Sequence, residues 1–189
     1  MRTSTLLTLG LALMSTVASA ATEQADAAGP HQLDFFIGAW SLESESLQRD
    51  GSYVSNTARS DVYRTLDGAA IQDDFRMLDG DGQAVFRGTS FRTFVPQSGK
   101  WAIKWVMAGE PGMTDITATW TGEELVMEGH GYDGMGKFLE KARYFDITDD
   151  SYEFVLSRSY DEGETWIENM NLIHAKRIAS VGSRDYPPK

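Results

Sequence analysis

The sequence of 189 residues contains no cysteine, only 5 prolines and fewer basic than acidic residues. The absence of cysteine excludes disulfide bonds, thiolate zinc sites, iron–sulfur clusters and cysteine nucleophiles. Lys and Arg together number 17 against 28 Asp and Glu, which gives a net charge of −11. A nucleic-acid-binding protein needs a basic surface for the phosphate backbone, so we expect no nucleic-acid partner.

Long apolar runs are scarce as well, and beyond residue 20 no segment approaches the roughly 18 apolar residues of a membrane-spanning helix. Before that point, Arg2 precedes the apolar run Leu6–Met14 and the small residues Ala18-Ser19-Ala20. This order is typical of a secretory signal peptide. We therefore expect 1–20 to be removed and the mature protein to be periplasmic or secreted, with no membrane span. Because no cysteine follows the apolar run, a lipid-anchored lipoprotein is excluded.

Turn-forming pairs divide the rest of the chain at short intervals. Pairs such as Asp50-Gly51 and Asp133-Gly134 favour tight hairpins, because glycine accepts positive φ and aspartate bonds its own backbone. Runs rich in aromatic and β-branched residues lie between the turns, and their apolar residues alternate with a period of two. The predicted strands are Trp40–Gln48, Ser52–Leu66, Ala70–Leu78, Ala84–Val95, Trp101–Met107, Met113–Trp120, Leu125–His130, Phe138–Ile147, Tyr152–Tyr160 and Thr165–Ile178.

Ten strands with short connections predict an all-β fold, an antiparallel meander preceded by a helical turn at Leu33–Ile37. A twisted sheet of this size closes into a barrel or splits into a sandwich. We favour the barrel, because it removes the exposed edges of a protein that lacks disulfide bonds. A barrel with this number of strands is wide enough for a ligand cavity. We expect a flexible linker over 21–30, the barrel domain over 31–178 and a tail over 179–189.

The first predicted strand begins with Gly38-Ala39-Trp40. The glycine allows a sharp turn, and the tryptophan can then cover the closed end of a barrel. This arrangement resembles the G-x-W motif of the lipocalins and their calycin relatives, in which a basic residue of the last strand packs on the tryptophan. The resemblance implies that Arg177 or Lys176 makes a cation–π contact with Trp40.

A wider pattern is similar to a bacterial family of uncharacterised lipocalin-like domains, which are often exported. The stretches that carry the resemblance are Leu33–Trp40, Gly88–Arg92 with the following Trp101, and Ser159–Trp166. It extends from Leu33 to Arg177, nearly the whole expected mature chain. The resemblance implies the barrel and carries no established activity.

The segment Ser159–Trp166 also matches the Asp-box pattern S-x-D-x-G-x-T-W, which sialidases carry. A glycosidase is one interpretation of this match. The residue types favour a structural interpretation, in which Asp161 makes a turn and the hydroxyls of Ser159 and Thr165 bond the loop backbone. We therefore expect a stable hairpin here and no catalytic group.

Two arginines, Arg92 and Arg158, share strand faces with large apolar residues. A buried guanidinium needs a carboxylate or a ligand anion as its partner. Either these arginines pair with internal Asp or Glu, which we favour, or one of them binds an anionic head group at the barrel mouth.

The function predicted from these patterns is the binding of a small hydrophobic or amphipathic molecule inside the barrel. If an arginine binds its head group, that molecule is an anion. Aromatic walls would supply apolar contact and an arginine would orient the polar end. We expect a binding protein rather than an enzyme, and no cofactor. The candidate ligand-binding residues are Trp40, Arg92, Trp105, Tyr144, Arg158, Met170 and His174.

Two histidines support alternative functions. His174 alternates with Met170 on the face of Trp166, which we take as the inner face of the last strand. An inward histidine there suits acid–base chemistry or the ligation of haem iron, as in the haem-binding relatives called nitrobindins. His130 shares a strand face with Glu128, which suits an acid–base or metal pair. The opposite face looks more like core, so we expect this pair to face outward.

Overall fold

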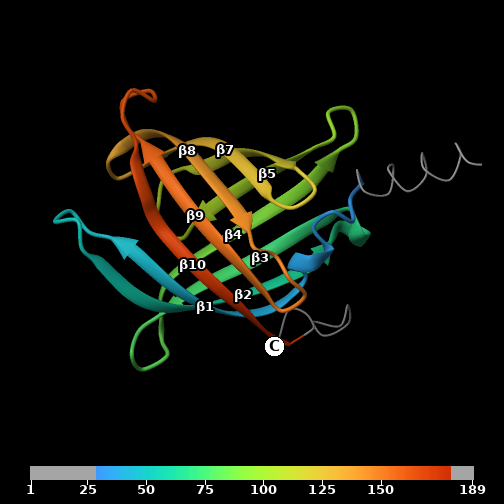
Figure 1. Ribbon diagram of the computed structural model, residues 1–189, viewed down its shortest axis with the longest axis horizontal. Coiled ribbons are helices and arrows are strands. Elements are labelled where there is room, and N and C mark those ends of the chain that lie inside the picture. The colour runs from blue at the N-terminus through green and yellow to red at the C-terminus, as the bar shows by residue number, and fades with distance from the viewer. Residues whose placement is uncertain (1–28, 180–189) are drawn as a thin grey trace, which may run out of the picture.

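The structure, a computed structural model, describes residues 29–179. The predicted signal peptide at 1–20, most of the linker at 21–30 and nearly all of the tail at 179–189 lie outside the described residues. Ten antiparallel strands form one closed barrel, in which each strand pairs with the next and β1 pairs with β10 (Figure 1). The predicted all-β barrel is therefore confirmed.

The predicted strand positions agree closely with the structure. β3, β4 and β6 have the predicted bounds, and the other strands differ by a few residues at their ends. The elements are η1 (Asp34–Phe36), β1 (Gly38–Leu47), β2 (Tyr53–Thr65), η2 (Leu66–Gly68), β3 (Ala70–Leu78), β4 (Ala84–Val95), β5 (Lys100–Met107), β6 (Met113–Trp120), β7 (Leu125–Asp133), β8 (Gly136–Phe145), β9 (Ser151–Ser159) and β10 (Ile167–Ala179).

The turn between β3 and β4 illustrates how the Asp-Gly pairs make hairpins. Asp79 Oδ1 accepts hydrogen bonds from the backbone N–H groups of Asp81 at 3.0 Å and Gln83 at 2.8 Å. Gly82 has a φ of 76°, a conformation that residues with a side chain rarely adopt. The carboxylate thus replaces missing strand hydrogen bonds while the glycine reverses the chain.

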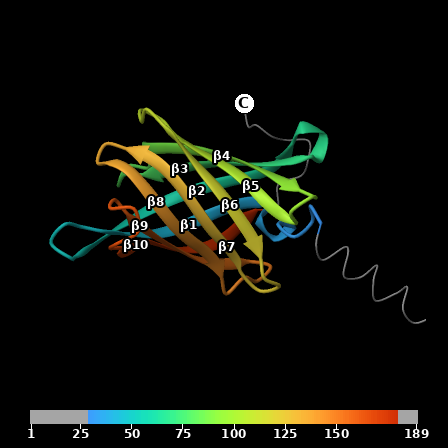
Figure 2. The same ribbon diagram turned by 90° about the horizontal axis from the view of Figure 1, so that it is seen from above.

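The N-terminal segment closes one end of the barrel. Figure 2 shows η1 at this end and the β1–β2 hairpin at the opposite end. Trp40 is fully buried, and its Nε1 donates a hydrogen bond of 2.9 Å to the carbonyl oxygen of Phe36. The Cζ atom of Arg177 lies 4.1 Å from the Trp40 ring centroid, and its two Nη atoms donate to the carbonyl oxygens of Phe35 and Ile37. The contact implied by the lipocalin resemblance is confirmed, and Arg177 makes it.

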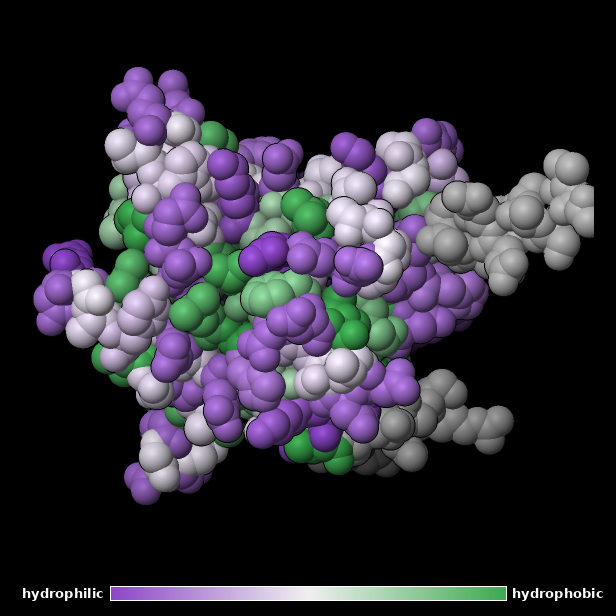
Figure 3. Space-filling model, in the orientation of Figure 1, coloured by the Kyte–Doolittle hydropathy of each residue, from purple (hydrophilic) through white to green (hydrophobic). Residues whose placement is uncertain are grey.

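Side chains fill the barrel interior next to this closed end. The fully buried apolar residues of this layer include Leu33, Trp40, Leu42, Val62, Ile71, Trp101 and Leu125. The outer face drawn in Figure 3 is mostly hydrophilic, with smaller hydrophobic areas. Among residues 29–179, no helix has the length and apolar character needed to cross a membrane.

Candidate functional site

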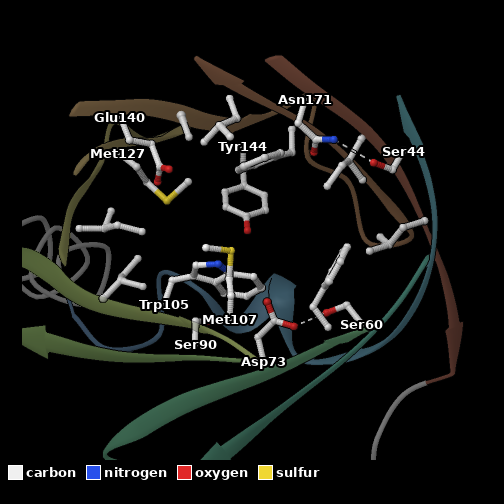
Figure 4. A pocket seen from close by; sticks show the side chains of 18 of the residues that line it. Ser44, Ser60, Asp73, Ser90, Trp105, Met107, Met127, Glu140, Tyr144 and Asn171 are labelled. Atoms are coloured by element: carbon white, nitrogen blue, oxygen red, sulfur yellow. Dashed lines mark hydrogen bonds between the residues drawn. The ribbon is translucent and has the colours of Figure 1, made fainter. Parts of the chain in front are cut away.

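Beyond the packed closed end, the barrel contains a cavity of about 250 Å³ to which all ten strands contribute side chains (Figure 4). A cavity of about 150 Å³ holds benzene, and sites for drug-sized molecules begin near 300 Å³. The cavity therefore suits a molecule with one or two rings or a short alkyl chain. Its apolar walls consist of Leu42, Phe75, Met77, Phe86, Ile103, Trp105, Met107, Ile116, Met127, Ala142, Phe154, Leu156 and Ile173.

Trp105 forms part of the wall because the neighbouring strand leaves room for its ring. A Cβ atom added at Gly88 would lie 2.3 Å from Cζ2 of Trp105, so only glycine allows the indole to lie against β4. The ring of Phe75 meets Trp105 edge to face, with centroids 6.1 Å apart. Met107 and Met127 are also part of the wall, and flexible thioether side chains adapt readily to ligands of different shape.

Arg92 and Asp73 form a buried ion pair in the wall of the cavity. Arg92 Nη2 donates to Asp73 Oδ2 at 3.4 Å and to Tyr144 Oη at 3.3 Å. Ser60 donates its hydroxyl hydrogen to the other oxygen of Asp73. The guanidinium also packs on Phe36 of the closed end, with Cζ 4.3 Å from the ring centroid. In Figure 4 the Tyr144 hydroxyl points into the cavity.

Several polar atoms of this cluster are buried without a partner. Arg92 is 4% exposed, yet its Nε and Nη1 find no hydrogen-bond partner among the residues that the structure describes. The hydroxyl of Ser90, on the same strand and in the same cavity wall, has none either. A buried donor left without an acceptor typically costs about 1–3 kcal/mol. Such atoms in a cavity wall indicate a place where a bound molecule or water supplies acceptors.

Burial shifts the titration of the groups around Arg92. The pKa of Asp73 is raised, because desolvation of the carboxylate outweighs the attraction of Arg92 and the hydrogen bond from Ser60. Burial likewise raises the pKa of Tyr144 to about 12, so its hydroxyl keeps its proton at neutral pH. The wall therefore offers uncharged hydroxyls and one guanidinium whose carboxylate partner is poorly solvated.

Arg158 lines another part of the same cavity and has more complete partners. Its Nη2 donates to Glu140 Oε2 at 2.8 Å, its Nε donates to the same oxygen at 3.0 Å, and its Nη1 donates to Asp133 Oδ2 at 3.1 Å. The guanidinium lies over Phe138, with Cζ 4.0 Å from the ring centroid. Desolvation raises the pKa of Glu140, against the opposing effect of Arg158. Both arginines thus have internal carboxylate partners, as favoured from the sequence, but the pairing is complete only at Arg158 and is limited at Arg92 to one contact of 3.4 Å with Asp73.

The structure brings four of the predicted ligand-binding residues together around the cavity: Arg92, Trp105, Tyr144 and Arg158. Trp40 lies in the closed end instead, where its ring centroid is 4.7 Å from that of Tyr152. Met170 lies in the irregular part of β10 between Ile167 and Asn171, outside the group of lining residues.

The prediction that His174 faces inward is wrong. Its strand partners are Glu43 of β1 and Glu153 of β9, and its Nδ1 is hydrogen-bonded to the Glu153 carboxylate on the outer face. The error arises because Trp166 was taken as an inward-facing residue. It lies outside the barrel, where the Lys141 Nζ atom is 3.8 Å from the centroid of its ring. The face that carries Trp166 and His174 is therefore the outer one, and an internal haem ligand at His174 loses its basis.

The inner face of β10 carries Asn171 and Ile173, which the sequence interpretation missed. Asn171 Nδ2 donates to Ser44 Oγ at 3.0 Å, as Figure 4 shows. The open choice between Arg177 and Lys176 for the Trp40 contact bears on this face, because Arg177 shares it with Asn171 and Ile173 whereas Lys176 shares the face of His174.

His130 faces outward as expected. Its side chain is 70% exposed, and its Nε2 lies 3.9 Å from Asp115 Oδ2. Glu128 shares this outer face and is exposed. Within residues 29–179, no three His, Asp or Glu residues are arranged to hold a metal ion. Acid–base chemistry inside the cavity therefore has neither His130 nor His174 to rely on.

The Asp-box segment forms the hairpin between β9 and β10. Asp161 Oδ1 accepts from the hydroxyl of Ser159 at 2.7 Å and from the backbone N–H of Thr165 at 2.9 Å. Asp161 Oδ2 accepts from the Thr165 hydroxyl, and the Ser159 hydroxyl oxygen accepts from the N–H of Gly163. All these groups serve the turn itself, so the structural interpretation is confirmed.

Comparisons with known proteins give information on the fold alone. No family model matches the sequence, and no curated protein matches it. The chain is similar in structure to Rv2717c from M. tuberculosis, with 14% identity and a TM-score of 0.59 over 79% of this chain and 97% of that one. It is also similar to the S-type phycobiliprotein lyase CPES from Guillardia theta, with 13% identity and a TM-score of 0.53 over 80% of this chain and 93% of that one. At these identities the likenesses show that the barrel fold is shared, and nothing finer.

Proposed function

We propose that this barrel binds one small molecule with an apolar body and a polar end in its interior. The observation that carries the proposal is the cavity of about 250 Å³, whose apolar walls surround a cluster with unpartnered polar atoms. A barrel interior that only stabilises the fold is filled with side chains, because voids lose dispersion contacts. Apolar walls with a few convergent polar groups are the usual features of a ligand site.

The proposal includes export to the periplasm or the medium. It rests on Arg2, the apolar run Leu6–Met14 and the small residues Ala18-Ser19-Ala20. The closed end is held by packing and by hydrogen bonds from Arg177, so the fold needs no disulfide bond. An exported carrier or receptor of small molecules agrees with all of these features.

The experiment that tests binding is a screen of fatty acids, isoprenoids and aromatic acids by thermal shift and native mass spectrometry. We expect compounds of one or two rings, or with short alkyl chains, to raise the melting temperature and to give a one-to-one complex. Stabilisation follows from binding to the folded state alone, and reaches about 2.7 kcal/mol at a hundredfold excess over Kd.

Gly88→Ala tests whether the interior is the site. The new Cβ atom would overlap the Trp105 ring at 2.3 Å, so the indole must move into the cavity and obstruct it. We expect ligand affinity to fall at least tenfold. Gly134→Ala is the matched control, because a Cβ atom there meets nothing within 4 Å and affinity should stay unchanged.

Two results would contradict the proposal. One is a screen in which no compound of suitable size stabilises the protein. The other is a ligand whose affinity is unaffected by Gly88→Ala in a folded variant, because that ligand would bind on the outside of the barrel.

A further inference from the structure

We infer that the polar end of the ligand is a carboxylate or similar oxygen acid, which Arg92 holds with the apolar part of the ligand against Trp105 and Met107. This inference rests on the proposed function and adds to it the charge of the ligand and its orientation. It assigns the ligand to Arg92 and not to Arg158, because the two arginines differ in their hydrogen bonds.

The two arginines differ in how many of their donors are used. Arginine has five N–H donors. In Arg158 all three nitrogens donate to Glu140 or Asp133, at 2.8 to 3.1 Å. In Arg92 only Nη2 donates, through two long bonds of 3.3 and 3.4 Å, while Nε and Nη1 have no partner among the described residues. Arg158 is therefore a structural residue, and Arg92 has donors left for a ligand.

The unpartnered atoms at and near Arg92 can all donate hydrogen bonds, so the ligand group that fits there is a hydrogen-bond acceptor. The free atoms of Arg92 are all donors, and the unpartnered hydroxyl of Ser90 lies in the same wall and can donate as well. An oxygen acid accepts several hydrogen bonds and forms charge-assisted bonds, which are roughly twice as strong as neutral ones. An ammonium group would bring a second positive charge next to the Arg92 guanidinium, so amines are disfavoured.

Asp73 leaves most of the hydrogen-bond donors of Arg92 unused. The Asp73 carboxylate shares its bonds with the Ser60 hydroxyl and meets Arg92 only at 3.4 Å. Burial already disfavours its charged form. A ligand carboxylate can therefore compete for the guanidinium. Acids are not drawn to the protein as a whole, because its net charge is −11. If the protein binds acids more tightly than alcohols of the same size, the cause must therefore be a positive charge within the cavity.

The experiment compares matched ligands by isothermal titration calorimetry near neutral pH. The probes are octanoic acid, octanol and octylamine, together with naphthoic acid, naphthalenemethanol and naphthylmethylamine. We expect the acid of the better-fitting set to bind about ten- to a hundredfold more tightly than its alcohol, and the amine most weakly.

Variants identify the responsible arginine. Asp73→Asn removes the competing carboxylate and should tighten acid binding severalfold. The double variant Asp73→Asn with Arg92→Met removes both charges, which avoids a buried unpaired ion, and should abolish the preference for the acid while alcohol binding persists. Persisting alcohol binding also shows that the cavity is intact. On the outer face, Glu124→Gln with Arg143→Met removes a comparable pair, 3.2 Å apart, and should leave the preference unchanged.

Outcomes separate this inference from the proposed function. If no member of either set binds, the proposed function itself fails. If acid and alcohol bind equally well, binding stands and the carboxylate inference is refuted, with water supplying the acceptors for Arg92. The inference also fails if the acid preference survives in the Asp73/Arg92 double variant. It fails equally if Glu140→Gln with Arg158→Met is the pair that abolishes the preference, because the head group would then be at Arg158.

Discussion

Replacing Arg177 by methionine should destabilise the barrel by opening its closed end. The guanidinium packs on Trp40 and donates to three carbonyl oxygens, those of Phe35, Ile37 and Asp149. Its side chain is 15% exposed. The three carbonyls belong to the η1 segment and to the β8–β9 turn, so this one residue of β10 connects elements far apart in sequence.

The size of the effect follows from these contacts. A hydrogen bond to a charged group contributes about 1.5–3 kcal/mol, and a desolvated cation–π contact about 2 kcal/mol. Methionine keeps the apolar contact with Trp40, and water can reach part of the released carbonyls. We therefore expect Arg177→Met to lower the free energy of unfolding by about 3 kcal/mol, well below the simple total. For a domain of this size, that loss lowers the melting temperature by roughly 6–12 °C.

The assay is urea denaturation followed by tryptophan fluorescence and circular dichroism, with Arg143→Met as the matched control. Arg143 also packs on an aromatic ring, that of Phe145 at 4.3 Å, and pairs with Glu124, but its side chain is 48% exposed. Exposed pairs contribute little, so the control should lose at most about 1 kcal/mol. Equal losses in the two variants, or no loss in Arg177→Met, would refute the role assigned to the closed end.

Two further predictions concern the Asp-box turn and export. Hydrogen bonds from the side chain and N–H of Thr165 and from the Ser159 hydroxyl lower the pKa of Asp161 to about 2, from 3.8. Because the folded pKa is the lower one, the stabilising effect of Asp161 is present above pH 3.8 and disappears as the pH falls toward 2. The difference in denaturation midpoint between wild type and Asp161→Asn should therefore shrink over this range, and a constant difference would contradict the turn role. For export, N-terminal sequencing of the periplasmic or secreted protein should give Ala21, whereas a chain that keeps residues 1–20 would disprove cleavage.

The fold was predictable because its causes are local. Most turns have local signals of their own, such as Asp79-Gly80, Ser98-Gly99 and Asp133-Gly134, and the strands between them alternate apolar and polar residues, so the ten strands could be placed one at a time. The closed end was predictable for a different reason. The Gly38-Ala39-Trp40 motif, through its lipocalin resemblance, implied a contact between residues of the first and last strands, and the structure has it at Trp40 and Arg177.

The inner face of β10 was mispredicted because aromatic character was taken as a sign of burial. Trp166 lies on the outside of the barrel, where the ammonium nitrogen of Lys141 is 3.8 Å from its ring centroid. The two candidates for the Trp40 contact implied opposite faces for this strand, because Lys176 shares a face with His174 and Arg177 does not. Register settles such conflicts, because residues opposite each other on paired strands share a face.

The distinction between the two cavity arginines lies beyond local sequence patterns. Arg92 and Arg158 both share a strand face with large apolar residues, and both have carboxylates on a neighbouring strand. What separates them is convergence across the barrel. Asp133 and Glu140 approach Arg158 from β7 and β8, whereas Arg92 meets a carboxylate shared with Ser60 and the hydroxyl of Tyr144. Whether the hydrogen-bond donors of a guanidinium are all used depends on these distances, so the choice of Arg92 for the proposed ligand contact follows from geometry and not from spacing in the sequence.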